Sequence, residues 1–188
     1  SGPPLAAAAA SGAEIELTGV EPVVLVEPLK VLRNMGAGLR IFGAAGPKAR
    51  IRMVMERRPA GITIDTGPYP GFPTDLQSLY LAAAMTLEGK SCICENVFED
   101  RLRTAEELQK MGGTLQICGK WLTAEKSRLH GAEVVSQDLR GGAALVSAAL
   151  AAEGFSTIRQ TELIERGYER FPETLRELGA KIIVEKEI

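Results

Sequence analysis

Three runs of small apolar residues divide the chain into similar parts. They span residues 5–10, 81–85 and 145–152. Each run has no polar face and is followed closely by a glycine, so the pattern predicts three buried helices that stop at Gly12, Gly89 and Gly154. An alternating or β-branched segment follows each glycine, which is typical of a strand.

A second helix completes each part of the chain. We expect it to begin with Pro28 in the first part and with Pro172 in the third, because proline is favoured at the first helical position. In the second part it follows Thr104, which forms the pattern of a capping box with Glu107. Each second helix stops at a glycine, and these glycines recur roughly every seventy residues: Gly36, Gly112 and Gly179.

The remaining alternation predicts strands within and between these repeats. They are expected at residues 37–41, 49–56, 62–65, 114–117, 121–126, 133–137 and 180–184. Three repeats of helix, strand, helix and strand predict an α/β ring with pseudo-threefold symmetry, and the alanine-rich helices suit its crowded centre. No strand precedes the first helix or follows the third repeat, so we expect a closing strand from chain outside this sequence.

The most distinctive loop is residues 66–77, TGPYPGFPTDLQ, in which glycines and prolines precede an apolar run. Because these residues fix opposite extremes of backbone freedom, they predict a rigid, irregular loop. Thr74 and Gln77 form the pattern of a capping box, which places Asp75 in the first turn of a helix. This local pattern allows Asp75 to be a residue of a well-capped helix start or a catalytic carboxylate.

Composition and charge limit the class of protein. With 188 residues, 45% of them hydrophobic, the chain can bury the core of a single domain. A formal net charge of -2, spread along the chain, predicts no nucleic-acid or membrane partner, and the lack of a leader or a spanning apolar run predicts a cytoplasmic protein. The single histidine and the spacing of the three cysteines give no expectation of a metal site, and we interpret the cysteines as reduced, half-buried strand residues.

Charged residues gather in loops at equivalent ends of the repeats. They are Asp75, Arg101, Asp138, Arg140 and Arg166. Three guanidinium groups suit a ligand that carries carboxylate and phosphate. Arg140 also precedes two glycines at a helix start, where backbone N–H groups could help to bind an anion. Each arginine alone fits a structural salt bridge as well, but the set favours an anionic site.

The same loops resemble those of one enzyme family. Residues 70–77 (PGFPTDLQ), 99–101 (EDR), 138–140 (DLR) and 166–169 (RGYE) closely resemble the C-terminal part of the UDP-N-acetylglucosamine enolpyruvyl transferases (UDP-N-acetylglucosamine 1-carboxyvinyltransferases). The resemblance covers essentially the whole chain. It implies that residues 1–188 are a single enolpyruvate transferase-like domain, an inside-out α/β barrel of three units. In that family a second such domain forms the other side of the substrate cleft, and the first strands of the polypeptide complete the C-terminal domain.

The resemblance also implies an activity that uses no cofactor. It is transfer of the enolpyruvyl group from phosphoenolpyruvate to the 3-hydroxyl of UDP-N-acetylglucosamine with release of phosphate, the first committed step of peptidoglycan synthesis. Asp75 matches the carboxylate that contacts this hydroxyl and is proposed as the base, and Val97 matches a backbone contact to the nucleotide sugar. Further matching positions lie on the phosphoenolpyruvate side: Arg101, Arg140 and Arg166, with Asp138 as a second acidic position.

The sequence departs from the family beside one of these arginines. Asp100 stands where the family usually has asparagine, and it could pair with Arg101 and weaken anion binding. The N-terminal catalytic domain, which carries the family's reactive cysteine, would have to come from outside this sequence, so we expect this chain alone to be inactive. The alternatives are a stand-alone nucleotide-sugar-binding or regulatory relative without catalysis, and a structural domain that pairs with another chain.

Overall fold

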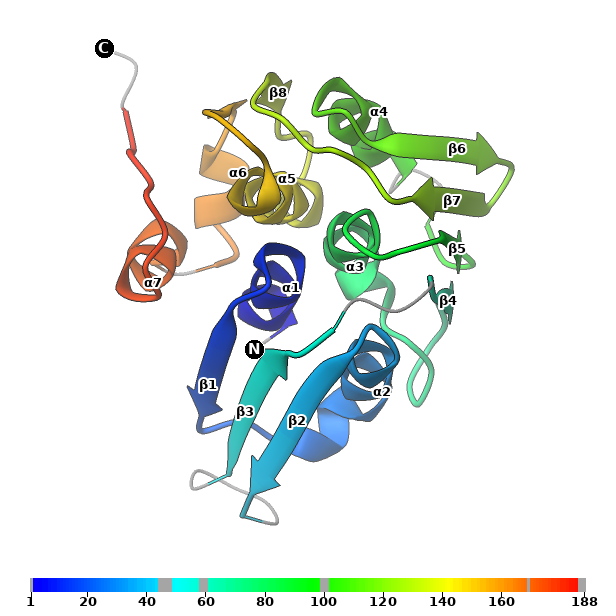
Figure 1. Cartoon of the computed structure of the whole chain (residues 1–188), viewed down its shortest axis with the longest axis vertical. Helices are drawn as coiled ribbons and strands as arrows, with labels where there is room; N and C mark the ends of the chain where they lie inside the picture. The colour runs from blue at the N-terminus through cyan, green and yellow to red at the C-terminus, as the bar shows by residue number, and fades with distance from the viewer. Residues whose placement is uncertain (1, 44–48, 58–60, 99–101, 169, 186–188) are drawn as a thin grey trace.

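The structure is a computed structural model that describes residues 2–43, 49–57, 61–98, 102–168 and 170–185. Three helices lie at its centre and pack against one another: α1 (Gly2–Ser11), α3 (Gln77–Ala84) and α5 (Leu139–Ala151). Figure 1 shows them seen nearly end-on, with the sheets outside. Their alanine-rich sequences allow the helix backbones to approach closely, and nearly all of α1 and α3 is buried. The three predicted helices are therefore confirmed, but α3 and α5 end at Ala84 and Ala151, before the predicted stops at Gly89 and Gly154.

The first sheet is antiparallel and has three strands in the order β1-β3-β2. The strands are β1 (Glu14–Thr18), β2 (Ala37–Phe42) and β3 (Arg50–Met55), with η1 (Pro22–Leu25) and α2 (Val26–Asn34) between β1 and β2. Ile51 and Met53 of the central strand are fully buried, whereas Arg50 and Arg52 are exposed on the other face. This alternation is the period of two that the sequence showed for residues 49–56.

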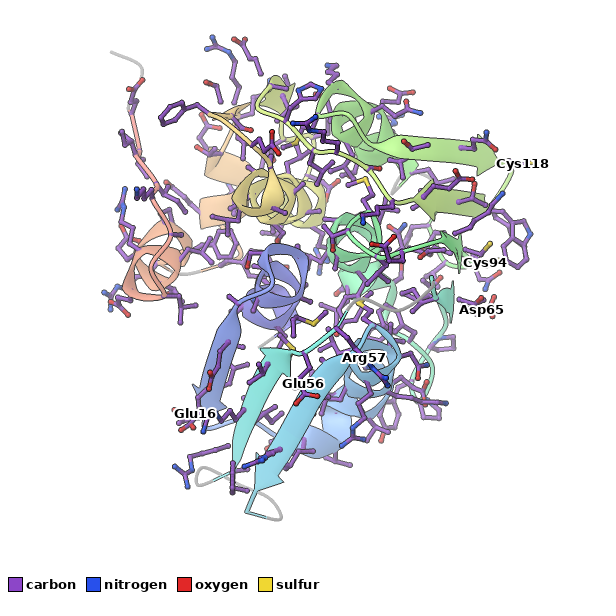
Figure 2. The ribbon with its side chains drawn as sticks, in the orientation of Figure 1. Glu16, Glu56, Arg57, Asp65, Cys94 and Cys118 are labelled. Atoms are coloured by element: carbon purple, nitrogen blue, oxygen red, sulfur yellow. The ribbon has the colours of Figure 1, made fainter. Side chains whose placement is uncertain are left out.

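The second sheet has four strands in the order β4-β5-β7-β6. The strands are β4 (Thr63–Asp65), β5 (Lys90–Cys94), β6 (Thr114–Cys118) and β7 (Trp121–Glu125), with α4 (Thr104–Lys110) before β6. β4 and β5 run parallel, and Asp65 lies opposite Cys94 at their carboxyl ends (Figure 2). The loops that leave these two strands therefore begin side by side. The cysteines have free thiols but differ in burial: Cys92 is half-buried, Cys94 buried and Cys118 exposed.

The third sheet contains two parallel strands, β8 (Glu133–Val135) and β9 (Thr157–Arg159). The helices α6 (Glu162–Glu165) and α7 (Phe171–Glu177) follow β9. The strand predicted at residues 180–184 does not form, and the prediction is wrong there. The side chain of Ile183 is 84% exposed, since no neighbouring strand in the described part of the chain pairs with this segment.

The ends of the second helices follow the sequence pattern better than their starts. The glycines after α2, α4 and α7 all have positive φ, as predicted: Gly36 (94°), Gly112 (87°) and Gly179 (95°). The capping box predicted at Thr104 is wrong, because the N-cap of α4 is Arg103 and Thr104 is the first residue of the helix. Glu107 instead accepts hydrogen bonds from the N–H of Val135 (3.0 Å) and from Lys110 (2.7 Å). A tertiary contact has replaced the local one.

Candidate functional site

A pocket of about 560 Å³ opens between the proline loop and the turn that follows β5. Both segments begin at the carboxyl ends of the parallel strands β4 and β5, the edge of an α/β sheet where ligands commonly bind. The pocket is lined by Gly67, Pro68, Tyr69, Pro73, Thr74, Asp75, Asn96 and Val97. Two of the predicted site residues, Asp75 and Val97, therefore share one concave surface.

The proline loop is closed on itself and anchored in the core. The N–H of Gly67 donates to the carbonyl of Phe72 (2.9 Å), which brings the two ends of the loop together. Phe72 is only 4% exposed and packs edge-to-face on Tyr80 of α3, with ring centroids 5.0 Å apart. The hydroxyl of Tyr80 donates to the carbonyl of Pro28, and burial raises the pKa of Tyr80. The irregular loop predicted from the sequence is thus observed, with an aromatic anchor.

Asp75 lies in a 3-10 turn, η2 (Thr74–Leu76), directly before α3. The capping box predicted from Thr74 and Gln77 does not form, and that prediction is wrong. The hydroxyl of Thr74 donates to both carboxylate oxygens of Glu95 at 2.8 Å, and Gln77 accepts a hydrogen bond from Ser78 instead. The charge-assisted hydrogen bonds to the buried carboxylate of Glu95 fix the orientation of the Thr74 hydroxyl.

Glu95 connects the proline loop to the turn after β5. Its side chain is in the interior, with the residue 3% exposed. Besides Thr74, it accepts hydrogen bonds from the hydroxyl of Thr66 (2.9 Å) and from the N–H groups of Val97 (2.9 Å) and Phe98 (3.1 Å). Because the N–H of Val97 is already donated to Glu95, the backbone group that Val97 can offer a ligand is its carbonyl.

Asp75 forms an ion pair with Arg140, whose Nη2 donates to Oδ2 of Asp75 at 2.7 Å. The side chains are 50% and 33% exposed, respectively, so the pair lies at the surface of the molecule. The hydrogen bond to Asp75 raises the pKa of Arg140 against the opposing effect of partial burial, which keeps the guanidinium charged. Nε of Arg140 is buried and has no hydrogen-bond partner among the described residues. The guanidinium therefore has a donor to spare.

Asp138 caps the N-terminus of α5. Its Oδ1 accepts from the N–H groups of Arg140 (2.8 Å) and Gly141 (2.9 Å), and the N–H of Gly142 donates to its carbonyl. The expectation that these N–H groups bind an anion is therefore wrong, because Asp138 already occupies them. The glycines serve packing instead: a Cβ on Gly142 would lie 2.2 Å from Oγ of Ser136.

Arg166 lies at the C-terminal end of α6, exposed and beside the start of α5. The adjacent Gly167 makes this approach possible, since a Cβ there would lie 2.2 Å from the side chain of Leu139. Tyr168 follows, close enough to Arg140 to contribute to the raised pKa of that guanidinium. The structure thus places Asp75, Asp138 and Arg140 together and puts Arg166 on a neighbouring turn.

Arg101 lies outside the described residues, so its predicted place in the site stays a prediction. Within the described ranges, no group of three or more histidine, cysteine, aspartate or glutamate side chains is placed to hold a metal ion. Among the helices of the same ranges, none has both the length and the apolar character to cross a membrane. The site therefore offers a carboxylate, a guanidinium and backbone groups around an open pocket.

Glu95 and Tyr168 are functional candidates that the sequence analysis missed. Tyr168 could have been identified from the sequence, because it belongs to the RGYE segment at 166–169. Glu95 had a weaker signal: it is the first acidic residue after an apolar strand, at the carboxyl end where loops meet.

The amino-acid sequence is similar to that of known enzymes. The model of the family EPSP synthase (3-phosphoshikimate 1-carboxyvinyltransferase) matches residues 1–175. UDP-N-acetylglucosamine 1-carboxyvinyltransferase 1 of Legionella pneumophila (strain Lens) is 44% identical over 182 residues, which cover 95% of this chain and 34% of that protein. The UDP-N-acetylglucosamine 1-carboxyvinyltransferase of Desulfofundulus thermocisternus is 42% identical over 179 residues, which cover 95% and 72%. The chain spans 34% to 42% of the length of several curated relatives, including two from Symbiobacterium thermophilum.

Solved structures share the fold. The enolpyruvyl transferase NikO from Streptomyces tendae superimposes with a TM-score of 0.79 at 25% identity, over 96% of this chain and 43% of that one. An EPSP synthase from Acinetobacter baumannii gives a TM-score of 0.74 at 24% identity, over 94% of this chain and 44% of that one. Both likenesses support the enolpyruvate transferase-like α/β fold.

Proposed function

Since this chain belongs to the EPSP synthase family, and within it to the UDP-N-acetylglucosamine 1-carboxyvinyltransferases, we propose that its parent protein makes enolpyruvyl-UDP-N-acetylglucosamine. The enolpyruvyl group of phosphoenolpyruvate moves to the 3-hydroxyl of the sugar, and phosphate leaves. The proposed setting is the cytoplasm, at the first committed step of peptidoglycan synthesis. The chemistry needs a group that takes the hydroxyl proton and cations that hold two anionic groups.

The proposal includes the place of this chain in a longer enzyme. It is one domain, residues 1–188, an inside-out barrel of three units that forms one wall of the substrate cleft. This chain covers only 34% to 42% of the length of several relatives, which supports this part of the proposal. The two-stranded third sheet and the exposed Ile183 support a closing strand from another part of the parent protein. An N-terminal catalytic domain is the implied partner, and this chain alone is expected to be inactive.

Asp75 is the proposed base. The hydroxyl oxygen of the sugar bonds to the carbon of phosphoenolpyruvate that carries the phosphate, while the methylene carbon gains a proton. Phosphate then leaves the carbon that carried it, and the former methylene carbon loses a proton, which restores the double bond. A carboxylate on the pocket wall, on a loop fixed by Phe72, can accept the hydroxyl proton with little reorganisation.

Arg140 has two successive partners in this proposal. Before substrates bind, it donates to Asp75, and that carboxylate oxygen is occupied. Phosphoenolpyruvate brings a carboxylate and a phosphate that compete for the guanidinium, whose Nε also has no partner among the described residues. Binding of the anion then frees the oxygen of Asp75 for the sugar hydroxyl. Arg101 and Arg166 would hold the rest of the anionic charge, with Asp138 fixing the backbone of Arg140.

Val97 is the proposed contact to the nucleotide sugar. It lines the same pocket as Asp75, and the backbone group that it can offer is the carbonyl, because its N–H donates to Glu95. A carbonyl is suited to accept a hydrogen bond from a donor on the sugar, such as an amide N–H. The pocket, at about 560 Å³, is in the size range of small-molecule sites.

The observation that carries the proposal is the 2.7 Å contact between Asp75 and Arg140, which joins two family motifs that are far apart in the sequence. The test is phosphate release by the full-length protein with both substrates. Asp75→Asn is expected to lower kcat by roughly a hundredfold or more. Glu133→Gln is the matched control, since Glu133 also accepts from an arginine, Arg159, at 2.7 Å but outside the site, and it should leave kcat unchanged.

Three results would contradict the proposal. One is a wild-type protein that releases no phosphate although it contains both domains. Another is an Asp75→Asn variant with normal kcat. The third is micromolar binding of UDP-N-acetylglucosamine by the 188-residue chain without turnover in any longer form, which would favour the stand-alone binding protein, because half of a cleft should bind weakly.

A further inference from the structure

We propose that Glu95 is a positioning residue, which holds the base and the nucleotide-sugar contact at fixed places on the pocket wall. The inference rests on the function proposed above. Glu95 does not face the pocket, and the residues through which it acts are Asp75 and Val97.

The hydrogen bonds of Glu95 reach both ends of the proline loop. Thr66 is the first residue after β4, and Thr74 directly precedes Asp75. Both hydroxyls donate to the same carboxylate, at 2.9 Å and 2.8 Å. The position of Asp75 is therefore fixed to β5, the strand that ends next to Glu95, and not only to the loop on which it lies.

The same carboxylate fixes the opposite wall. It accepts the N–H groups of Val97 and Phe98, which form the turn after β5. Asn96 closes the network, because its N–H donates to Oγ1 of Thr66 (2.9 Å) and its side-chain amide donates to the carbonyl of Thr66 (3.0 Å). Two segments that bound the pocket thus share one set of hydrogen bonds.

A direct chemical role for Glu95 does not fit its surroundings. Glu95 is only 3% exposed and does not line the pocket, and four protein groups already donate to its carboxylate, so it is not placed to take a proton from a substrate. Among the described residues, no lysine, arginine or histidine forms a salt bridge with it. A buried carboxylate without a cation costs free energy that an apolar residue would not, and its fixed hydrogen bonds are what compensate for this cost. They order the turn and the loop relative to each other.

Glutamine separates positioning from charge. Oε1 of Glu95 accepts from Val97 and Phe98 and from the hydroxyls of Thr66 and Thr74, and a glutamine carbonyl at the same place keeps these bonds. The amide nitrogen would replace Oε2, and the hydroxyl of Thr74 can accept from it while it still donates to Oε1. Glu95→Gln should therefore preserve the positions of both walls, whereas Glu95→Ala removes every bond.

The experiment compares variants of the full-length protein by the Kd for UDP-N-acetylglucosamine, kcat, the KM for phosphoenolpyruvate and the melting temperature. We expect Glu95→Ala to weaken nucleotide-sugar binding roughly tenfold to a hundredfold and to lower kcat, with the KM for phosphoenolpyruvate changed less than about threefold. Glu95→Gln should stay within about threefold of wild type in all four. The control is Ser91→Ala, which removes a buried acceptor of the Ile62 N–H at the other end of β5 and should lower only the melting temperature.

Several outcomes overturn the inference. Normal nucleotide-sugar binding by Glu95→Ala would leave a purely structural role, and a Glu95→Gln variant as defective as Glu95→Ala would show that charge matters instead of position. If Glu95→Ala does not fold, Thr74→Val tests the same network by removing one donor, with Thr74→Ser as its rescue. Binding by Thr74→Val equal to that of Thr74→Ser would then refute it. A wild-type protein that binds no nucleotide sugar refutes the proposed function itself, a different result from normal binding by the variants.

Discussion

The ion pair between Asp75 and Arg140 gives the sharpest quantitative prediction. It joins the proline loop to the start of α5, so its strength measures how firmly these two parts of the site hold each other before substrate binds. The perturbation is a double-mutant cycle of Asp75→Ala, Arg140→Ala and the double variant. The cycle isolates the interaction between the two side chains from the other effects of each substitution.

The magnitude follows from distance and exposure. A hydrogen bond to a charged group at 2.7 Å contributes about 1.5 to 3 kcal/mol when it is well shielded. These side chains are 33% and 50% exposed, however, and solvent reduces pairs at the surface to about 0.2 to 1 kcal/mol. The coupling free energy should therefore be about 1 kcal/mol, at the upper end of the range for surface pairs.

The assay is urea unfolding of the 188-residue chain and its three variants at neutral pH, in low salt and in about 1 M sodium chloride. The coupling should fall clearly in high salt, because the Debye length is then about 3 Å, close to the separation of the charges. A coupling below about 0.3 kcal/mol in low salt would mean that the contact does not hold the site together. A coupling free energy of about 1 kcal/mol that is the same in low and high salt would mean that packing, not charge, connects the two residues.

Three further predictions concern the frame around the site. Gly142→Ala should lower the free energy of unfolding by about 1 to 3 kcal/mol in urea titrations, because its Cβ has no room, whereas Gly67→Ala, with no atom near its Cβ, should change it by less than about 0.5 kcal/mol. The hydrogen bond from Arg159 lowers the pKa of Glu133, so this carboxylate stabilises the fold above its unfolded pKa and stops doing so as the pH falls. Melting temperatures between about pH 5 and pH 3 should therefore fall less steeply in Glu133→Gln than in wild type. Phe72→Ala should cost about 3 to 5 kcal/mol in the same urea titrations, since it removes the buried anchor of the proline loop.

The elements that could be predicted are those whose signal is local. A helix that stops at a glycine with positive φ needs no information from the rest of the chain, and Gly36, Gly112 and Gly179 all behave as the sequence indicated. A strand is different, because its hydrogen bonds belong to a neighbour. Residues 180–184 have the alternation of a strand but no partner strand among the described residues, and the segment stays unpaired.

The site shows the same division. Asp75 was a candidate from its own loop and Val97 only from the resemblance to the family, and the structure places both on the wall of one pocket. The partner of Thr74 could not be predicted in this way. A capping box is a contact with a residue three positions away, whereas Glu95, which accepts from the Thr74 hydroxyl, lies 21 positions away in the sequence. A single sequence does not reveal which distant side chain the fold brings to a hydroxyl.

The positions of Asp75 and Arg140 depend on the packing of the central helices. Asp75 lies just before α3 and Arg140 in the first turn of α5, and these two helices pack directly against each other. Both helices are rich in alanine, so they pack closely and the distance between them cannot change much without a clash or a cavity. A larger side chain at a buried alanine of α5 such as Ala144 has no free space, and we expect it to displace α5 and lengthen the Asp75–Arg140 contact. Catalysis, which depends on distances within a fraction of an ångström, should then fall before the fold is lost.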